Sequence, residues 1–361
     1  MKVLLLAVIV SVLFMPYTFY AQGCAAPSSD EGVTIWGYLQ PEFAANFEDD
    51  TRAAFSFRRM RIGAMGNIPY DFSYYVLLET SQFANPNSKS PYLLDAFVSY
   101  NRFRNARIAI GSFKYPFGLE LTNACHGLYT IRRSKIVNEM TADYDAVGNR
   151  DMGVMILGGS DTTRFTYKVA LTNGYGVTNV NPNLMDSYSL TARVTFKPIN
   201  PLRIGVSVRN GELPPESSDV TKNDTKMRLG FDVAWKYNNL YLMGEYIDGE
   251  DKGSFTTGGG CDGPGEIMTG QKTTSGWYFM AVYRFANNFE PVYKIEGYKA
   301  NKSNPGEVAS LNDEESSTCQ TFGLNYYPND WTRLQLNYTY SAESPTEVNN
   351  DALLLQLQIR F

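Results

Sequence analysis

The side chains able to do chemistry in this sequence are mainly arginines and lysines at close spacing. Arg59 and Arg61 stand two residues apart, and a second group holds Arg132, Arg133 and Lys135. A guanidinium group binds two oxygens of a phosphate at once, whereas an ammonium group attracts an anion as a point charge. This pattern predicts a site that binds anions without reacting with them.

Composition excludes several other kinds of chemistry. The chain of 361 residues has one histidine, His126, which excludes a two-histidine mechanism and a His-rich metal site. A hydrolase built on serine and histidine would need His126 beside a nucleophile motif, and none lies near it. A pI near 5.2 gives no support to nucleic-acid binding. We predict no enzymatic activity, no metal and no cofactor.

The first residues predict export from the cytoplasm. A lysine precedes an apolar run over 3–14, Pro16 ends the run, and small or polar residues follow it. This order is typical of a signal peptide, and the run is too short for a spanning helix. We predict a signal peptide over 1–23 and a mature chain over 24–361. Attachment of a lipid to Cys24 is the alternative.

Apolar and polar residues alternate along most of the mature chain. In the last segment Leu355, Leu357 and Ile359 share one parity, while Gln356 and Gln358 share the other. Such alternation indicates strands with one apolar face, and it predicts about sixteen of them. They cover 33–47, 55–68, 72–83, 92–102, 106–114, 151–158, 164–172, 188–197, 202–209, 227–236, 240–248, 277–285, 289–299, 319–327, 333–340 and 353–361.

The strands and their connections favour an all-β transmembrane barrel of the up-and-down antiparallel type. No apolar run of about 18 residues follows residue 15, which excludes membrane-spanning helices. Strands of about ten residues are long enough to cross a bilayer at a tilt, and Tyr and Trp cluster at their ends, as at membrane interfaces. Short turns alternate with longer loops, as in barrels with periplasmic turns and extracellular loops. A periplasmic β-sandwich is the soluble alternative.

One connection is much longer than a surface turn requires. The longer connections are predicted at 48–54, 84–91, 115–150, 173–186, 210–224, 249–274, 300–318 and 342–350. Loops as long as 115–150 are usually functional or mobile, and this one carries Arg132, Arg133 and Lys135 before Arg150. Folded into the lumen, it would form a basic constriction. The alternative is an exposed basic turn of helix.

The parity of each strand also assigns its charged residues to the lumen or to the lipid. The inward parity collects more than twice as many basic as acidic residues, although the whole chain has a net charge of −5. The basic residues of this wall include Arg107, Arg164, Lys168, Arg193, Lys197, Arg203, Arg209 and Arg228. Such a wall favours anions because low-dielectric surroundings focus its field. A strand shifted by one residue would change several of these assignments.

Four cysteines occur, without the spacing of a metal site. Cys261 and Cys319 fall in or beside long loops, and an exported protein permits a disulfide between them. The alternative is that Cys125, Cys261 and Cys319 are unrelated thiols.

Several short stretches resemble a known family. They are Phe57-Arg58-Arg59-Met60-Arg61-Ile62-Gly63 with Gly66, Leu94-Asp95-Ala96-Phe97-Val98, Gly111-Ser112-Phe113-Lys114-Tyr115-Pro116-Phe117-Gly118, Arg133-Ser134 with Val137-Asn138, Arg150-Asp151-Met152-Gly153-Val154, and Asn173-Gly174. Their order and spacing resemble the phosphate-selective porin O and P family of outer-membrane channels over essentially the whole mature chain.

The resemblance implies a sixteen-stranded, usually trimeric barrel that admits anions, phosphate among them. It places the residues that match its motifs at the wall and constriction, namely Arg59, Arg61, Lys114, Arg133 and Arg150. This chain departs from the pattern in two ways. Arg132 stands where the family often has an acid, and the stretch 119–130, which holds Cys125 and His126, has no match.

The leading hypothesis is a passive porin of the bacterial outer membrane that prefers anions. Its expected partners are inorganic anions such as phosphate, outer-membrane lipid and two further copies of itself. A general or saccharide-preferring porin is the alternative, in which Tyr75, Phe97, Tyr241 and Tyr278 offer stacking surfaces. A surface protein whose acidic loops bind partners is a further alternative.

Overall fold

The structure is a computed structural model that describes residues 32–47, 52–84, 91–141, 149–174, 176–177, 188–213, 224–257, 266–303 and 313–361. The predicted signal peptide over 1–23, Cys24 and Cys261 lie outside these residues. Cys319 is a free, buried thiol inside a strand rather than in a loop, and its Sγ lies 3.2 Å from Ser341 Oγ.

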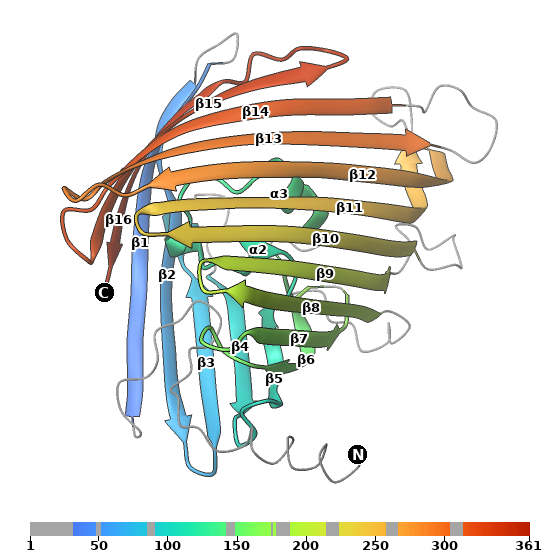
Figure 1. The fold of residues 1–361 in the computed structure, drawn as a ribbon. Coiled ribbons are helices and arrows are strands. Elements are labelled where there is room, and N and C mark those ends of the chain that lie inside the picture. The colour runs from blue at the N-terminus through green and yellow to red at the C-terminus, as the bar shows by residue number, and fades with distance from the viewer. Residues whose placement is uncertain are drawn as a thin grey trace.

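Sixteen antiparallel strands form one closed barrel, as the alternation predicted (Figure 1). They are β1 (Gly32–Asn46), β2 (Arg52–Ile68), β3 (Phe72–Glu79), β4 (Tyr92–Tyr100), β5 (Arg107–Lys114), β6 (Arg150–Gly158), β7 (Phe165–Thr172), β8 (Tyr188–Ile199), β9 (Leu202–Leu213), β10 (Asp224–Tyr237), β11 (Leu240–Thr257), β12 (Glu266–Tyr283), β13 (Phe289–Ser303), β14 (Asp313–Tyr326), β15 (Thr332–Ser344) and β16 (Ala352–Arg360). Each strand pairs with its neighbours in the chain, and β1 also pairs with β16. The predicted fold class is confirmed.

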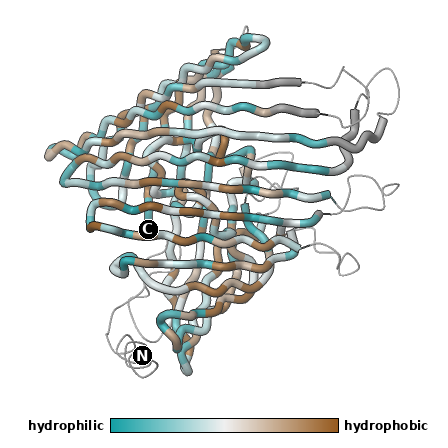
Figure 2. The backbone as a smooth tube through the Cα atoms, turned by 45° about the vertical axis from the view of Figure 1, so that its right-hand side comes forward, coloured by the Kyte–Doolittle hydropathy of each residue, from teal (hydrophilic) through white to brown (hydrophobic). Residues whose placement is uncertain are grey.

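The barrel has apolar side chains on its outer face and polar side chains on its inner face, which is the reverse of a soluble protein. On β16, Leu355 and Ile359 are 46% and 40% exposed, whereas Gln356 and Gln358 are 1% and 3% exposed. Figure 2 shows the same alternation of apolar and polar positions along many strands. Apolar side chains therefore face outward and polar ones face the lumen, which is the arrangement that a surrounding bilayer requires.

The barrel closes where the C-terminal strand meets the first strand. The register runs from Tyr38 opposite Arg360 to Asn46 opposite Ala352. Beyond it, the backbone N–H of Gly37 donates to the Phe361 carbonyl at 2.8 Å, and the Phe361 N–H donates to the Gly37 carbonyl at 3.0 Å. Closure leaves no strand edge in hydrocarbon, where water could not satisfy its polar groups.

Tight turns join the strands at the end of the barrel that holds the C-terminus. Tyr70 and Asp71 both have a positive φ of 68°, and Asn238 and Asn288 have positive φ as well. Hairpin turns with positive φ match the twist of the strands they connect, and Asn and Asp tolerate that conformation. These are the positions where the sequence predicted short turns.

The hairpins of the opposite end extend further than predicted. β11 continues to Thr257 and β12 begins at Glu266, so most of the predicted connection over 249–274 is strand. The predicted loop over 300–318 is likewise shortened by β13 and β14. We infer that these extensions stand above the apolar belt, where a strand needs no apolar face and the alternating pattern fades.

The connection between β5 and β6 enters the barrel (Figure 1). It holds the helices α2 (Leu119–Thr122) and α3 (Lys135–Thr141) and the short helix η2 (Cys125–Gly127), and a further short helix, η1 (Ser81–Ala84), follows β3. Its apolar side chains pack against Met243, Ile247 and Tyr278 on the inner wall of β11 and β12. In the described part of the chain no helix is long and apolar enough to cross a membrane.

A carboxylate of the wall holds this inserted segment in place. The backbone N–H groups of Leu119 and Glu120 donate to Glu245 Oε1 and Oε2 at 3.1 and 3.0 Å, and the Tyr278 hydroxyl donates to Oε2 at 3.2 Å. Gly118 precedes them with a φ of 66°, and its N–H donates to Ser207 Oγ at 3.0 Å. A Cβ at Gly118 would overlap Glu245 Oε1.

Gly118→Ala is expected to loosen the inserted segment. The change forces an L-residue into left-handed backbone and pushes the Glu245 carboxylate off two amides, at a combined cost of about 2 kcal/mol or more. Limited proteolysis of the refolded barrel should cut the segment faster, and single-channel currents should become noisier. Gly127→Ala is the matched control, because no atom lies within 4 Å of a Cβ built there. Equal behaviour of the two variants would contradict the anchoring role of Gly118.

Candidate functional site

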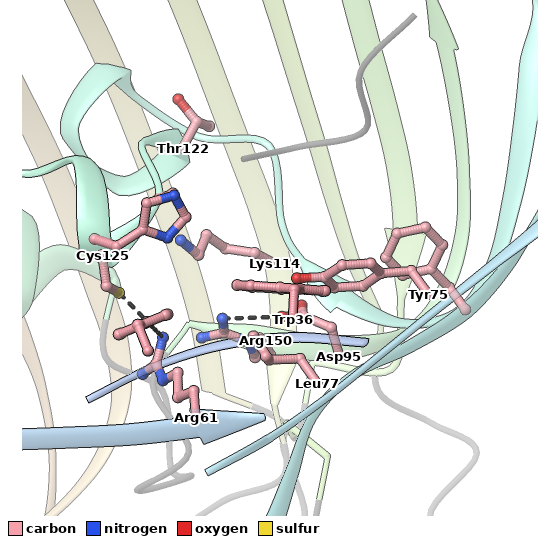
Figure 3. Close-up of a pocket in the computed structure, with 13 residues that line it drawn as sticks. Trp36, Arg61, Tyr75, Leu77, Asp95, Lys114, Thr122, Cys125 and Arg150 are labelled. Atoms are coloured by element: carbon pink, nitrogen blue, oxygen red, sulfur yellow. Dashed lines mark hydrogen bonds and ion pairs between the residues drawn. The ribbon is translucent and has the colours of Figure 1, made fainter. Parts of the chain in front are cut away.

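Basic side chains from the wall and from the inserted segment meet at one narrow place in the lumen. A cavity of about 40 Å³ there is lined by Arg61, Lys114 and Arg150 together with Cys125 and His126. Figure 3 shows Arg61 and Arg150 extending from the wall, with Cys125 of the inserted segment next to Arg61 and joined to it by a dashed line. The lining includes one carboxylate, that of Asp95.

Arg61 joins the wall to the inserted segment. Its Nε donates to Glu79 Oε2 at 2.7 Å, and its Nη1 donates to the Tyr38 hydroxyl at 2.9 Å and to Cys125 Sγ at 3.2 Å. Arg61 and Glu79 are opposite one another on β2 and β3, so strand register fixes this ion pair. The guanidinium is thereby held in one orientation at the cavity.

Lys114 and Arg150 lie opposite one another at the ends of β5 and β6. Like charges in that position destabilise a strand pair. Asp95 on β4 offsets part of the repulsion, since Arg150 Nη2 donates to its Oδ2 at 3.0 Å. Lys114 Nζ donates to the Asn123 carbonyl at 3.2 Å, which ties it to the inserted segment.

Arg59 and Arg133 contribute charge that no neighbouring carboxylate offsets. Arg59 Nη1 donates to Gln40 Oε1 at 3.0 Å, and Arg133 Nη2 donates to the Asn123 carbonyl at 3.0 Å. Within the part of the chain that the structure describes, neither forms an ion pair. The oxygens that they bind are neutral, so no carboxylate cancels the charge of either guanidinium group beside the cavity.

Cys125 sits among these cations. Arg133 Nη1 and Nη2 lie 3.5 and 3.6 Å from its Sγ, in addition to the contact with Arg61. Burial alone would raise the pKa of the Cys125 thiol, but the charges of Arg133 and Arg61 outweigh it and hold the pKa well below its usual value. The neighbouring His126 is neutral near pH 7, because burial and the charge of Arg360 lower its pKa to about 4.

Two of the predicted constriction residues lie elsewhere. Arg132 Nη1 donates to Glu42 Oε2 on β1 at 2.6 Å. Lys135 begins α3, and its Nζ lies 4.5 Å from the centre of the Tyr298 ring on β13. Both anchor the inserted segment to the wall rather than joining the cluster around Cys125.

The predicted wall residues divide into two groups within the lumen. Arg193 and Arg228 are buried and paired, with Asp232 and Asp251 respectively, while Arg209 stacks on the Tyr115 ring at 4.1 Å. Lys168 lies opposite Arg193 in the β7–β8 register, and Arg209 lies opposite Arg228.

Residues of the second group lie near the tight turns. Arg107 Nη2 donates to the Gly159 carbonyl at 3.2 Å, and Lys197 and Arg203 border another cavity described below. Arg164 directly precedes β7, its carbonyl accepts from the Lys197 N–H at 2.7 Å, and its side chain is exposed.

The aromatic residues proposed as stacking surfaces have three different environments. The rings of Tyr75 and Phe97 lie 5.4 Å apart at a tilt of 31°, and Trp36 stacks on Tyr75 at 5.9 Å. Tyr278 is only 2% exposed beneath the inserted segment. Tyr241 lies 5.3 Å from Tyr129, which belongs to the inserted segment.

Sequence reasoning missed Cys125, Tyr38 and Trp36 as neighbours of the cations. Cys125 lies in the stretch that matched no motif, and its contacts reach residues 64 positions away along the chain. The parity of β1 does place Trp36 and Tyr38 on the same face as Gln40 and Glu42, so their inward orientation was readable from the sequence.

Solved structures of other outer-membrane proteins share the fold of this chain. The anion-selective porin from Comamonas acidovorans has a TM-score of 0.65 and 11% identity, covering 91% of this chain and 99% of that one. The trimer form of OmpT from Vibrio cholerae has a TM-score of 0.61 and 12% identity over 91% and 99% of the two chains. OmpF from Salmonella typhi, in complex with daunomycin, has a TM-score of 0.61 and 13% identity over 91% and 97%. No curated protein matches the sequence.

A closed sixteen-stranded barrel with a polar lumen and an inserted segment defines an outer-membrane porin. The family model for phosphate-selective porin O and P matches residues 35–361. The chain belongs to that family, as the sequence motifs indicated, and it is a multi-pass β-barrel of the bacterial outer membrane.

The thiol of Cys125 is expected to react with a small neutral methanethiosulfonate at a rate that changes little between about pH 6.5 and pH 8.5. An ordinary thiol would gain almost tenfold per pH unit over much of this range, because the thiolate is the reacting species. The measurement uses mass spectrometry on refolded protein in which Cys24, Cys261 and Cys319 are Ser. Arg133→Gln should restore a steeper pH dependence. A steep profile in the parent protein would show that Cys125 is an ordinary thiol.

Proposed function

We propose that this protein is a passive channel that prefers anions, phosphate among them, and that the inserted segment forms its constriction. The supporting observation is the meeting of Arg59, Arg61 and Arg133 with Lys114 and Arg150 around Cys125. Small hydrophilic solutes cross down their gradient, and no catalytic step or cofactor is involved. Residues 1–23 act as a signal peptide that export removes.

The balance of paired and unpaired charge supports anion preference. Ion pairs with Glu79 and Asp95 hold Arg61 and Arg150 in fixed positions. Arg59 binds a neutral amide oxygen, and Arg133 binds a neutral carbonyl oxygen beside Cys125 Sγ. Neither has a carboxylate partner among the described residues, so a passing anion meets an excess of positive charge. Low-dielectric walls strengthen that attraction, and an open lumen lets the solute leave.

Reversal potentials in a planar bilayer under a KCl gradient test this proposal. The refolded protein should be anion-selective, and phosphate should reduce the chloride current. Arg59→Gln together with Arg133→Gln should lower the anion-to-cation permeability ratio about twofold or more, since two uncompensated charges leave the constriction. Arg102→Gln is the control, because Arg102 is exposed at a tight turn and pairs with Asp71 outside the cluster.

Cation selectivity, or no preference, would refute the anion-channel proposal. Block by oligosaccharides without any response to phosphate would instead favour a saccharide porin. That second candidate is supported by the row formed by Trp36, Tyr75 and Phe97 beside the cavity, because the C–H face of a sugar packs well on an aromatic ring. An absence of conductance would point to a surface protein.

We also propose that three copies assemble side by side through their lipid-facing strands. The trimer form of OmpT, which has the same fold, supports this. Native mass spectrometry of protein extracted from the outer membrane should give three times the mass of the mature chain. Heating should reduce the measured mass to that of a single chain. A single-chain mass before heating would contradict the trimer.

A further inference from the structure

A second, larger cavity lies at the end of the barrel that carries the tight turns. Its volume is about 340 Å³, within the size range of small-molecule sites. Gly127 and Tyr129 of the inserted segment form one side, and the turns around Pro201 and Lys236 form the other. Ala124 borders both this cavity and the smaller one at the constriction, so the two adjoin.

The charge of this cavity is entirely basic. Lys197, Arg203 and Lys236 line it, and none of the described residues of its lining is Asp or Glu. Lys197 Nζ donates to the Asp161 carbonyl, and Arg203 interacts with the Tyr241 side chain. These partners are neutral groups, so they leave the positive charge of the cavity in place.

Two tyrosines and two amides supply the rest of the surface. The rings of Tyr129 and Tyr241 are half-buried, 5.3 Å apart and inclined by 56°. Asn123 and Asn200 line the same space. An amide both donates to and accepts from hydroxyl groups, and the C–H face of a sugar packs well on an aromatic ring.

We propose that this cavity binds a phosphorylated monosaccharide, with the phosphate among Lys197, Arg203 and Lys236 and the sugar against Tyr129 and Tyr241. Inorganic phosphate alone would leave the rings and most of the volume unused, whereas a neutral sugar would leave three cations unmatched. The site extends the proposed channel function, which supplies the route by which such a solute reaches it. It is separate from the cluster around Cys125.

Isothermal titration calorimetry of the refolded mature chain in detergent tests the site. The probes are glucose 6-phosphate, glucose, inorganic phosphate and 4-nitrophenyl phosphate. Glucose 6-phosphate should bind at least about threefold more tightly than each of the others, because only it uses both the cations and the rings. Equal or tighter binding of inorganic phosphate, or tighter binding of the aromatic phosphate, would overturn the assignment.

Substitutions test the aromatic side and the basic side of the cavity separately. Tyr241→Leu should weaken the binding of glucose 6-phosphate about three- to tenfold and leave the binding of inorganic phosphate unchanged. Tyr241→Phe should keep most of the affinity for the sugar phosphate. The double variant Arg203→Gln, Lys236→Gln should weaken the binding of both ligands. Tyr237→Leu is the matched control, since Tyr237 is an exposed tyrosine at the same turn and lies outside the cavity. A change in gel mobility after heating confirms that each variant is folded.

The outcomes for this site and for the channel can be told apart. If Tyr241→Leu does not change glucose 6-phosphate binding, the site proposal fails. The reversal potentials described above measure the cluster around Arg59 and Arg133 and do not involve Tyr241. Retained anion selectivity would then leave the channel proposal standing, whereas loss of selectivity would remove the route on which the site depends.

Discussion

In the hydrocarbon core of a bilayer, a backbone N–H or C=O group without a partner costs several kcal/mol, because no water reaches it. The pairing of β1 with β16 meets this constraint by leaving no strand edge. Closure in turn requires every strand to place alternate residues inside and outside. The lumen therefore receives the polar half of each strand, and the density of buried charge on the wall is a consequence of closure.

The inserted segment occupies part of the lumen, and the wall of the barrel holds it there. Glu245 anchors its start on β11, while Asn337 on β15 accepts the Ile131 N–H at 2.7 Å. The Arg333 guanidinium donates to the Leu128 carbonyl at 2.9 Å. Polar groups of the wall thus satisfy the backbone of a segment that lies inside the barrel.

The fold was predictable from sequence because the signal is local and repeated. Alternation in each strand needs no knowledge of its partners, and tight turns are marked by residues such as Asn238 and Asn288. The alternation fades where a strand needs no apolar face, as in the parts of β11 and β12 beyond the apolar belt.

The candidate site was only partly predictable, for a different reason. Arg61, Lys114, Arg133 and Arg150 come together as the motifs implied, because strand register carries three of them. Arg132 and Lys135 flank Arg133 in sequence but reach β1 and β13, since neighbouring residues at the start of a helix point in different directions. Parity arguments apply to strands, and they cannot orient a segment folded into the lumen.

The number of basic residues on the wall is a poor measure of the field that a solute meets. Arg61, Arg150, Arg193 and Arg228 each have a carboxylate partner, so these cations act mainly as rigid framework. Guanidinium groups bound to neutral oxygens differ, because such partners fix their position without cancelling their charge. The positive field on the wall therefore depends less on the total of Arg and Lys than on where neutral partners replace carboxylates. The inserted segment supplies such partners through its backbone carbonyls.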